Sequence, residues 1–176
     1  MEDVEVYWAA RDLDKFFWGN HHFLLIKIPQ DRKLTRIINL DEGKWRFITL
    51  AGHLPDKHLV FRANDDSDVQ SVREFINPKL AGTFYDYDLE KHQVPPPTGG
   101  GFGFAQKLID LAFNYQRNTE TNPVEYVLWD ENCACWVNTI LKVAGVSKDD
   151  RMKIGEFHGI DWGEEQLLDE SLFNST

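Results

Sequence analysis

The chain contains two cysteines, Cys133 and Cys135, and the first has the sequence context of a nucleophile. It follows Asn132, a residue type that commonly caps helices, and the predicted helix ends at Gly145, where glycine is a favoured stop. A thiol in the first turn of a helix lies beside unpaired backbone N–H groups and the positive end of the helix dipole, which favour the thiolate. The same N–H groups can stabilise an oxyanion, so the pattern predicts a nucleophilic Cys133.

The predicted helix has an apolar face formed by Cys133, Val137, Ile140, Leu141 and Ala144. Cys135 lies roughly 200° round the helix from Cys133. We therefore expect Cys133 to face the core and Cys135 to face away from it. The alternative is that Cys133 is only a small buried hydrophobe, which is the usual role of a lone cysteine.

A nucleophilic thiol works with a base that accepts its proton, and imidazole is the usual choice. Of the six histidines, His21 and His22 begin the most apolar predicted strand, residues 23–28. Side chains alternate along a strand, so His22 shares a face with Leu24 and Ile26, and that face stays apolar to its end. We therefore predict that His22 packs under the helix and is the general base. The alternative is a hydrogen-bonded core histidine.

Further site residues follow from the same elements. His53 continues the alternating face of a second predicted strand and is the first candidate for orienting the imidazole, with Asn39 and Thr49 as alternatives. Trp18, just before the histidine strand, and Asn132 are expected to line the substrate site. Carbohydrate stacking is an alternative role for the tryptophans, but most of them lie in predicted strands or helices, which favours core packing.

The elements that must position these residues predict an α+β fold. Short β-branched and aromatic runs bounded by turn residues predict strands over 4–8, 23–28, 34–40, 45–51, 59–62 and 83–87, most simply as an antiparallel meander. Helical spacing predicts helices over 68–76, with Asp68 as a cap, and over 104–115, 133–144 and part of the tail. A Pro/Gly-rich connection over 94–103 separates the two kinds of element. We expect one domain, 1–176, with the nucleophile's helix packed on the sheet.

Composition excludes several classes of function. The 176 residues include 19 Lys and Arg against 29 Asp and Glu, a net charge of −10, which disfavours nucleic acid as a partner. Apolar residues make up 42%, enough for a core, yet no run reaches the roughly 18 residues of a membrane span. The acidic start does not resemble a secretory leader, so we expect a cytoplasmic protein or one exported without a leader.

Neither a metal nor a cofactor is expected. The two cysteines do not form a Cys-x-x-Cys motif, and no second pair completes a structural zinc site. The alternative is zinc held by the cysteines together with the His21-His22 doublet. The Gly-rich run lacks the Gly-Lys-Ser/Thr sequence of a phosphate-binding loop.

Residues 126–137, YVLWDENCACWV, resemble the Asn-Cys helix start of the circularly permuted papain-like cysteine hydrolases. This group includes permuted NlpC-type cell-wall peptidases, PPPDE isopeptidases and lecithin retinol acyltransferase-like enzymes. In its members the catalytic histidine precedes the cysteine on an apolar strand, and His22-Phe-Leu-Leu-Ile26 is similar to that strand. The resemblance covers about residues 20–62 and 120–146.

The resemblance implies a papain-like fold and a cysteine peptidase or amidase, with Cys133 and His22 as the catalytic pair. It implies an amide, peptide or isopeptide substrate, cell-wall peptides (peptidoglycan) among them, with no cofactor. Three alternatives stay open, namely a protein isopeptidase, a thioester acyltransferase and a non-catalytic interaction module that keeps the fold. The acyltransferase reading lacks the apolar or basic membrane-facing segment that such enzymes use.

Overall fold

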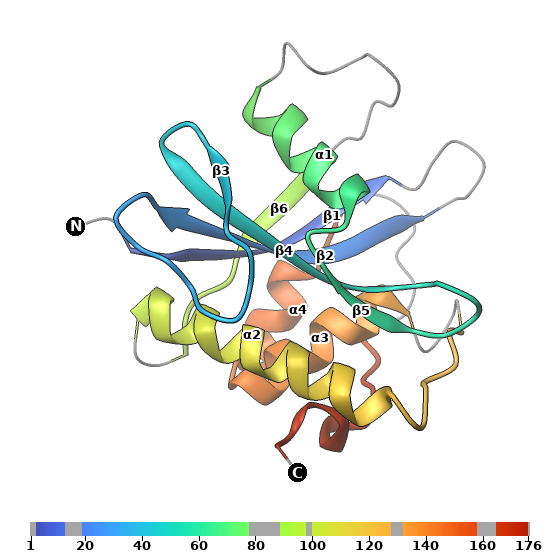
Figure 1. Cartoon of the computed structure of the whole chain (residues 1–176). Coiled ribbons are helices and arrows are strands. Elements are labelled where there is room, and N and C mark those ends of the chain that lie inside the picture. Colours follow the sequence, from blue (N-terminus) through green and yellow to red (C-terminus); the bar gives the residue numbers. More distant parts are fainter. Residues whose placement is uncertain are drawn as a thin grey trace.

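The centre of the molecule is an antiparallel six-stranded sheet with helices on both faces (Figure 1). The computed structural model describes residues 3–12, 19–77, 89–97, 100–127, 132–157 and 165–175. The strands are β1 (Glu5–Asp12), β2 (Asn20–Pro29), β3 (Leu40–Glu42), β4 (Trp45–His53), β5 (Val60–Ala63) and β6 (Leu89–Gln93). Their order is β3-β4-β2-β1-β6, and β5 pairs with β4. Because β4 lies between β2 and β3, the sheet is not the simple meander expected.

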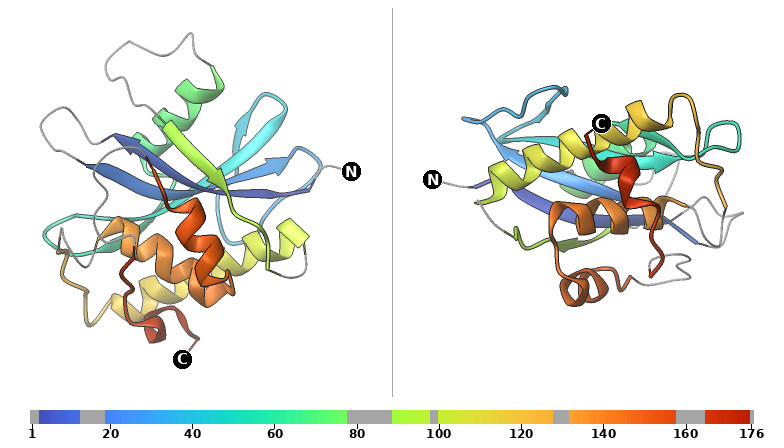
Figure 2. Two further views of the ribbon diagram at one scale, coloured as in Figure 1. Left: turned by 180° about the vertical axis from the view of Figure 1, so that it is seen from behind. Right: turned by 90° about the horizontal axis from the view of Figure 1, so that it is seen from below.

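The helices are divided unequally between the two faces. They are α1 (Asp66–Ile76), α2 (Gly100–Thr119), α3 (Cys133–Ala144), α4 (Lys148–Ile154) and the short 3-10 helix η1 (Glu170–Phe173). Helix α1 lies on one face, and the others lie on the opposite face (Figures 1 and 2). The predicted α+β class with an antiparallel sheet is confirmed. No helix in the described ranges is both long enough and apolar enough to cross a bilayer.

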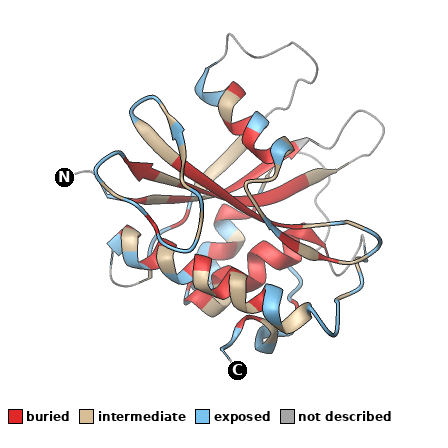
Figure 3. Ribbon diagram, in the orientation of Figure 1, coloured by how far each residue is buried: buried red, intermediate tan, exposed pale blue. Residues whose placement is uncertain are grey.

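Two cores result from this division, one on each face of the sheet. On β2, Leu24 and Ile26 belong to the larger core with α2 and α3, whereas Phe23 and Leu25 belong to the smaller core under α1. This is the period-2 alternation of a strand, with both faces buried. The central strands are accordingly buried over most of their length (Figure 3).

Helix α3 has the two ends that the sequence predicts. The Asn132 side chain accepts hydrogen bonds from the N–H groups of Ala134 and Cys135, at 2.9 and 3.1 Å. Gly145 has φ +104°, and its N–H bonds to the carbonyls of Leu141 and Lys142. A left-handed residue at this position favours glycine, which has no Cβ to clash.

The expectation that Cys135 faces away from the core is wrong. Cys135 is fully buried within the larger core, and every residue from Cys133 to Leu141 is buried. The reason is tertiary, because α3 contacts β2 and β4 on one side and α2, α4 and η1 on others. A helix covered on several sides has no polar face to reveal which thiol points inward.

Other boundaries also differ from the expected ones. Helix α2 begins at Gly100, inside the predicted connection, and a Cβ on Gly101 would lie 1.8 Å from the Val4 carbonyl oxygen. That glycine therefore permits close packing and does not act as a linker. Residues 34–39 form a loop tied by Asn39, and only Leu40 of that predicted strand is in β3. The strand predicted over 83–87 lies outside the described residues.

Strands β2 and β4 separate at one end, and this separation creates the space for α3. Their pairing begins at Leu24 and Leu50, so the first residues of β2 have no partner on β4. Beyond Leu50, β4 pairs with β5 instead. Helix α3 approaches β4 most closely at Gly52, where an added Cβ would lie 3.0 Å from the Trp136 ring and 2.7 Å from Leu59.

Gly52→Ala is expected to lower the free energy of unfolding by about 1–3 kcal/mol, because the added methyl group overpacks the contact between β4 and α3. Urea denaturation monitored by circular dichroism measures the change. Gly103→Ala is the matched control, because Gly103 is at an exposed position of α2 where an added Cβ meets nothing within 4 Å. It should raise stability by about 0.5–1 kcal/mol through helix propensity. Equal effects of the two substitutions would contradict the close approach.

Candidate active site

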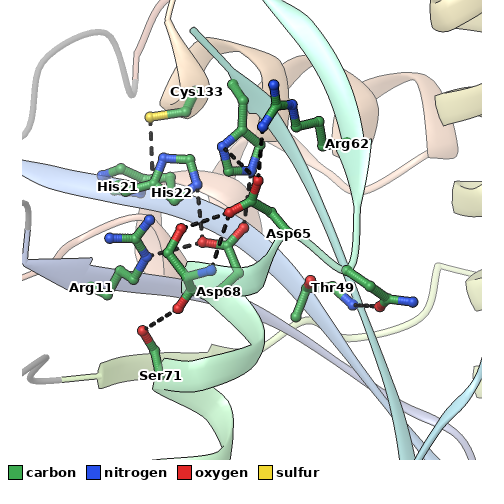
Figure 4. Close-up of polar contacts among 12 residues, drawn as sticks. Arg11, His21, His22, Thr49, Arg62, Asp65, Asp68, Ser71 and Cys133 are labelled. Carbon is green, nitrogen blue, oxygen red and sulfur yellow. Dashed lines mark hydrogen bonds and ion pairs between the residues drawn. The ribbon is translucent and has the colours of Figure 1, made fainter. Parts of the chain in front are cut away.

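The sulfur of Cys133 lies at the gap between β2 and β4. The backbone N–H of His22 donates to Cys133 Sγ at 3.5 Å (Figure 4). This N–H is available because the first residues of β2 have no β4 partner. The side chain is buried, with 5% of the residue exposed. The start of α3 therefore positions the thiol beside the beginning of the histidine strand, as the capped helix predicts.

The imidazole that meets the thiol belongs to His21. Charge attraction between this ring and the Cys133 sulfur, with a smaller hydrogen-bonding contribution, shifts the pKa values of both groups toward their charged forms. His21 Nε2 lies 3.3 Å from Asp68 Oδ1, an ionic contact in which the ring N–H is not aligned for a good hydrogen bond. Figure 4 shows Cys133, His21 and Asp68 as neighbours, with the Cys133 sulfur in contact with the His22 backbone N–H and the His21 ring in contact with the Asp68 carboxylate.

Asp68 is the centre of a buried charge network. Its carboxylate accepts a hydrogen bond from Arg11 Nε at 2.9 Å and contacts His53 Nε2 at 3.1 Å, and its side chain is 1% exposed. Burial alone would raise the pKa of Asp68, but the charge of His21, the His53 contact and the charge of Arg11 together hold it well below its usual range. Asp68 is therefore a carboxylate at any working pH.

Asp68 was expected to cap a helix, and this expectation is wrong. The N-cap is Asp65, whose carboxylate accepts the N–H of Ser67 at 3.2 Å. Asp68 lies one turn further into α1 and faces the sheet beside buried Val69 and Val72. A carboxylate on the buried stripe of a helix requires polar or charged partners. The presence of Asp68 among the apolar positions of this helix is therefore the sequence signal that could have identified it as a site residue.

The two reacting groups have displaced pKa values. Burial would lower the pKa of His21, but the Asp68 carboxylate and the Cys133 sulfur raise it to about 9. Burial would raise the pKa of Cys133, but His21, followed by His22, lowers it to about 6. At neutral pH the pair is therefore a thiolate and an imidazolium.

His22 lies where the sequence places it but has another partner. It shares the larger core with Leu24 and Ile26, and its Nδ1 accepts a hydrogen bond from Trp8 Nε1 at 3.0 Å. An indole N–H can only donate, so this ring nitrogen is held unprotonated. The backbone of His22 contacts the sulfur, while the ring packs against Trp8 and Phe157. The ring beside both the thiol and the Asp68 carboxylate is therefore that of His21, whereas the His22 ring packs in the core; the role of His22 as base stays a prediction.

The candidates for the third residue fall in different places. His53 is in the network, 4.6 Å from His21 between ring centroids, and it shares Asp68 with His21. Asp68, and not His53, thus lies directly behind the base. Asn39 ties its own loop, and Thr49 is a buried residue of β4. Trp18 lies outside the described residues.

Tyr126 is a site residue that sequence reasoning missed. Its phenol hydrogen-bonds the Cys133 side chain and also accepts the backbone N–H of Cys133. Burial, followed by the Cys133 sulfur, raises the pKa of Tyr126 far above its usual value, so the phenol stays protonated and can donate. The position of Tyr126 is set by its N–H, which donates to Lys57 O at 2.8 Å.

Two first-turn N–H groups are not available for an oxyanion. Those of Ala134 and Cys135 are both satisfied by Asn132. Asn132 was expected to line the substrate site. In the structure its side chain caps the start of α3. Donors close to the sulfur are the His22 backbone N–H, the Cys133 N–H and the Tyr126 hydroxyl.

His21, His53 and Asp68 are also metal-ligand types, and their ligand atoms lie within 4.8 Å of one another. Asp68 already binds the Arg11 guanidinium at 2.9 Å, however, and a metal ion would have to replace or share that positive charge. The two histidines are therefore better explained as partners of the Asp68 carboxylate, together with Arg11, than as ligands of a divalent ion.

No protein-family model matches the chain, and no curated protein and no solved structure shows significant similarity to it. The chemistry of the site is therefore what can support a function.

The thiolate can be tested directly through alkylation. The rate of iodoacetamide modification of Cys133 should rise with an apparent pKa of about 6. In Asp68→Asn the imidazolium loses its counter-ion, so the pKa of His21 falls, the pKa of Cys133 rises, and the rate at pH 6–7 drops by about tenfold or more. Mass spectrometry with time-resolved quenching measures the rate.

Asp66→Asn is the matched control, because it makes the same charge change at an exposed site in the same helix turn. It should leave the alkylation profile unchanged. Near-ultraviolet circular dichroism checks that both variants are folded. Identical profiles for the two variants would contradict a role for the buried carboxylate.

Proposed function

We propose that the protein is a thiol hydrolase that cleaves an amide, peptide or isopeptide bond through an acyl-enzyme. Cys133 is the nucleophile, His21 the proton carrier and Asp68 the group that holds the imidazole. The observation that carries this proposal is the buried series of Asp68, His21 and Cys133, with its thiolate and imidazolium at neutral pH. A structural cysteine in an apolar core has its pKa raised, and this one is lowered.

The reaction follows from the ion pair. The Cys133 thiolate bonds to the substrate carbonyl carbon and pushes the electron pair onto the carbonyl oxygen. Collapse of this intermediate breaks the C–N bond while the His21 imidazolium gives its proton to the leaving amine. Water then attacks the thioester with neutral His21 taking its proton, and loss of the thiolate restores the ion pair.

Two donors close to the sulfur, the Cys133 N–H and the Tyr126 hydroxyl, stabilise the oxyanion. In the free protein these two groups bond to each other, so the carbonyl oxygen must enter between them. The raised pKa of Tyr126 supports this role, because an ionised phenolate could not donate.

The substrate class rests on the resemblance to the permuted papain-like hydrolases. In that group the histidine strand precedes the cysteine helix, and here β2 precedes α3. Cell-wall peptides and protein isopeptides are the two substrates to compare. Both present an amide carbonyl to the thiolate and an amine that leaves with the His21 proton.

The assignment of the base can be tested by comparing the two adjacent histidines. Cys133→Ala and Cys133→Ser should abolish turnover of peptidoglycan tetrapeptides or ubiquitin-like conjugates, measured by mass spectrometry. His21→Asn should lower turnover by about 10²–10⁴-fold, the range of general acid–base catalysis. His22→Asn loses the Trp8 hydrogen bond, worth about 1 kcal/mol of stability, but keeps the pH dependence of the remaining turnover.

Cys135→Ala is the matched control for the thiol and should retain turnover and acyl-enzyme formation. A loss of turnover in His22→Asn together with normal pH dependence in His21→Asn would overturn the assignment to His21. Alkylation at Cys133 without any acyl-enzyme on either substrate would count against hydrolysis of these bonds.

Tyr126→Phe tests the oxyanion donor. Removing one such donor typically lowers kcat by about 10²–10³-fold. Because binding of the ground state does not need this hydroxyl, KM should change much less than kcat. The measurement is steady-state hydrolysis on whichever substrate is turned over, and an unchanged kcat would remove Tyr126 from the mechanism.

A further inference from the structure

A pocket lies on the α1 face of the sheet, away from Cys133. It has a volume of about 200 Å³. Leu25 and Phe47 of the sheet and Val72, Phe75 and Ile76 of α1 contribute its apolar lining. Asp68 lies in the first turn of α1, whereas these helix residues lie in its later turns. The pocket therefore shares a helix with the candidate active site but none of its residues.

The charged residues that line this pocket are all cationic, in a chain with a net charge of −10. Lys27 Nζ pairs with Glu5 at 3.2 Å and lies 3.6 Å from the Trp45 ring centroid. Arg46 pairs with Asp41 at 2.8 Å. These two charges are already compensated.

Lys91 differs from the other two cations. Its Nζ lies 4.0 Å from the ring centroid of Tyr7 and 5.2 Å from that of Phe75. Within the described part of the chain it has no carboxylate at ion-pair distance. Burial lowers the pKa of Lys91 and the neighbouring Lys27 lowers it further, and these two effects outweigh the Glu5 carboxylate, which raises it. An ammonium group held beside aromatic rings and another cation gains stability when an anion arrives.

We propose that this pocket binds a carboxylate attached to an aromatic or branched apolar group, with the carboxylate against Lys91 and the apolar group between Phe75 and Phe47. The volume is below the roughly 300–1,000 Å³ of sites for drug-sized ligands, so it suits one ring or a short branched chain. The negative end of α1 is at Ile76, which directs the anion to the lysine on β6 and away from the helix end. A free acid and the last residue of a peptide both have this chemistry.

The experiment compares an acid with its neutral isostere on the full chain. Isothermal titration with 4-phenylbutyrate and 4-phenylbutyramide should give an affinity for the acid about tenfold higher, the gain of one partly desolvated ion pair. Lys91→Gln should abolish this preference, and Lys91→Arg should restore it. Phe75→Ala, at a half-exposed position that tolerates truncation, should weaken binding of both compounds.

Lys153→Gln makes the same charge change at an exposed position of α4 and is the matched control. It should leave the affinities for 4-phenylbutyrate and 4-phenylbutyramide unchanged. N-acetylphenylalanine distinguishes the two sources of the carboxylate. If it binds more tightly than 4-phenylbutyrate, the ligand is a peptide C-terminus; if it binds more weakly, the ligand is a free acid. Equal affinity for acid and amide in the unmodified chain overturns the proposal. So does a preference for the acid that persists in folded Lys91→Gln, or the absence of binding by every probe at millimolar concentration.

Discussion

The charge of Asp68 is the constraint on which the arrangement of this molecule depends. A carboxylate that is 1% exposed is stable only with several polar or cationic partners, and these come from three strands, with Arg11 on β1, His21 on β2 and His53 on β4. Breaking a buried ion pair typically costs about 3–5 kcal/mol. The carboxylate therefore fixes α1 against the sheet at the point where β2 and β4 separate. The same charge raises the pKa of His21, and the His21 charge in turn lowers the pKa of Cys133.

The sequence predicts the position of Cys133 better than the positions of its neighbours, because Cys133 is positioned by local structure. Asn132 and Gly145 define α3 by backbone geometry alone, and both ends lie where expected. The choice between His21 and His22 depends on what covers each face of β2. Both faces are covered, one by α1 and one by α3, so the apolar character of the His22 face did not identify the ring that contacts Asp68. The gap between β2 and β4 is a tertiary feature that no local pattern encodes.

The same distinction applies to the fold. The α+β class, the antiparallel pairing and the main strands follow from alternation and turn residues. The position of β4 between β2 and β3, the burial of Cys135 and the start of α2 at Gly100 do not, since each depends on contacts between distant segments. Gly101 illustrates the point, because a glycine in a Pro/Gly-rich run looks like a linker until the Val4 carbonyl is seen against it.

Because two histidines are adjacent in β2, the register of this strand decides which of them faces Asp68 and which faces Trp8. A strand that slips by one residue exchanges its faces, and in most sheets that exchange removes every functional side chain from its site. Here one imidazole would replace the other, so the slipped strand would still offer a ring to Asp68 and a ring to Trp8. What prevents the exchange is the aliphatic pattern that follows, because Leu24 and Ile26 would then enter the smaller core. Which of the two histidines contacts Asp68 is thus decided by aliphatic residues that do not touch the carboxylate.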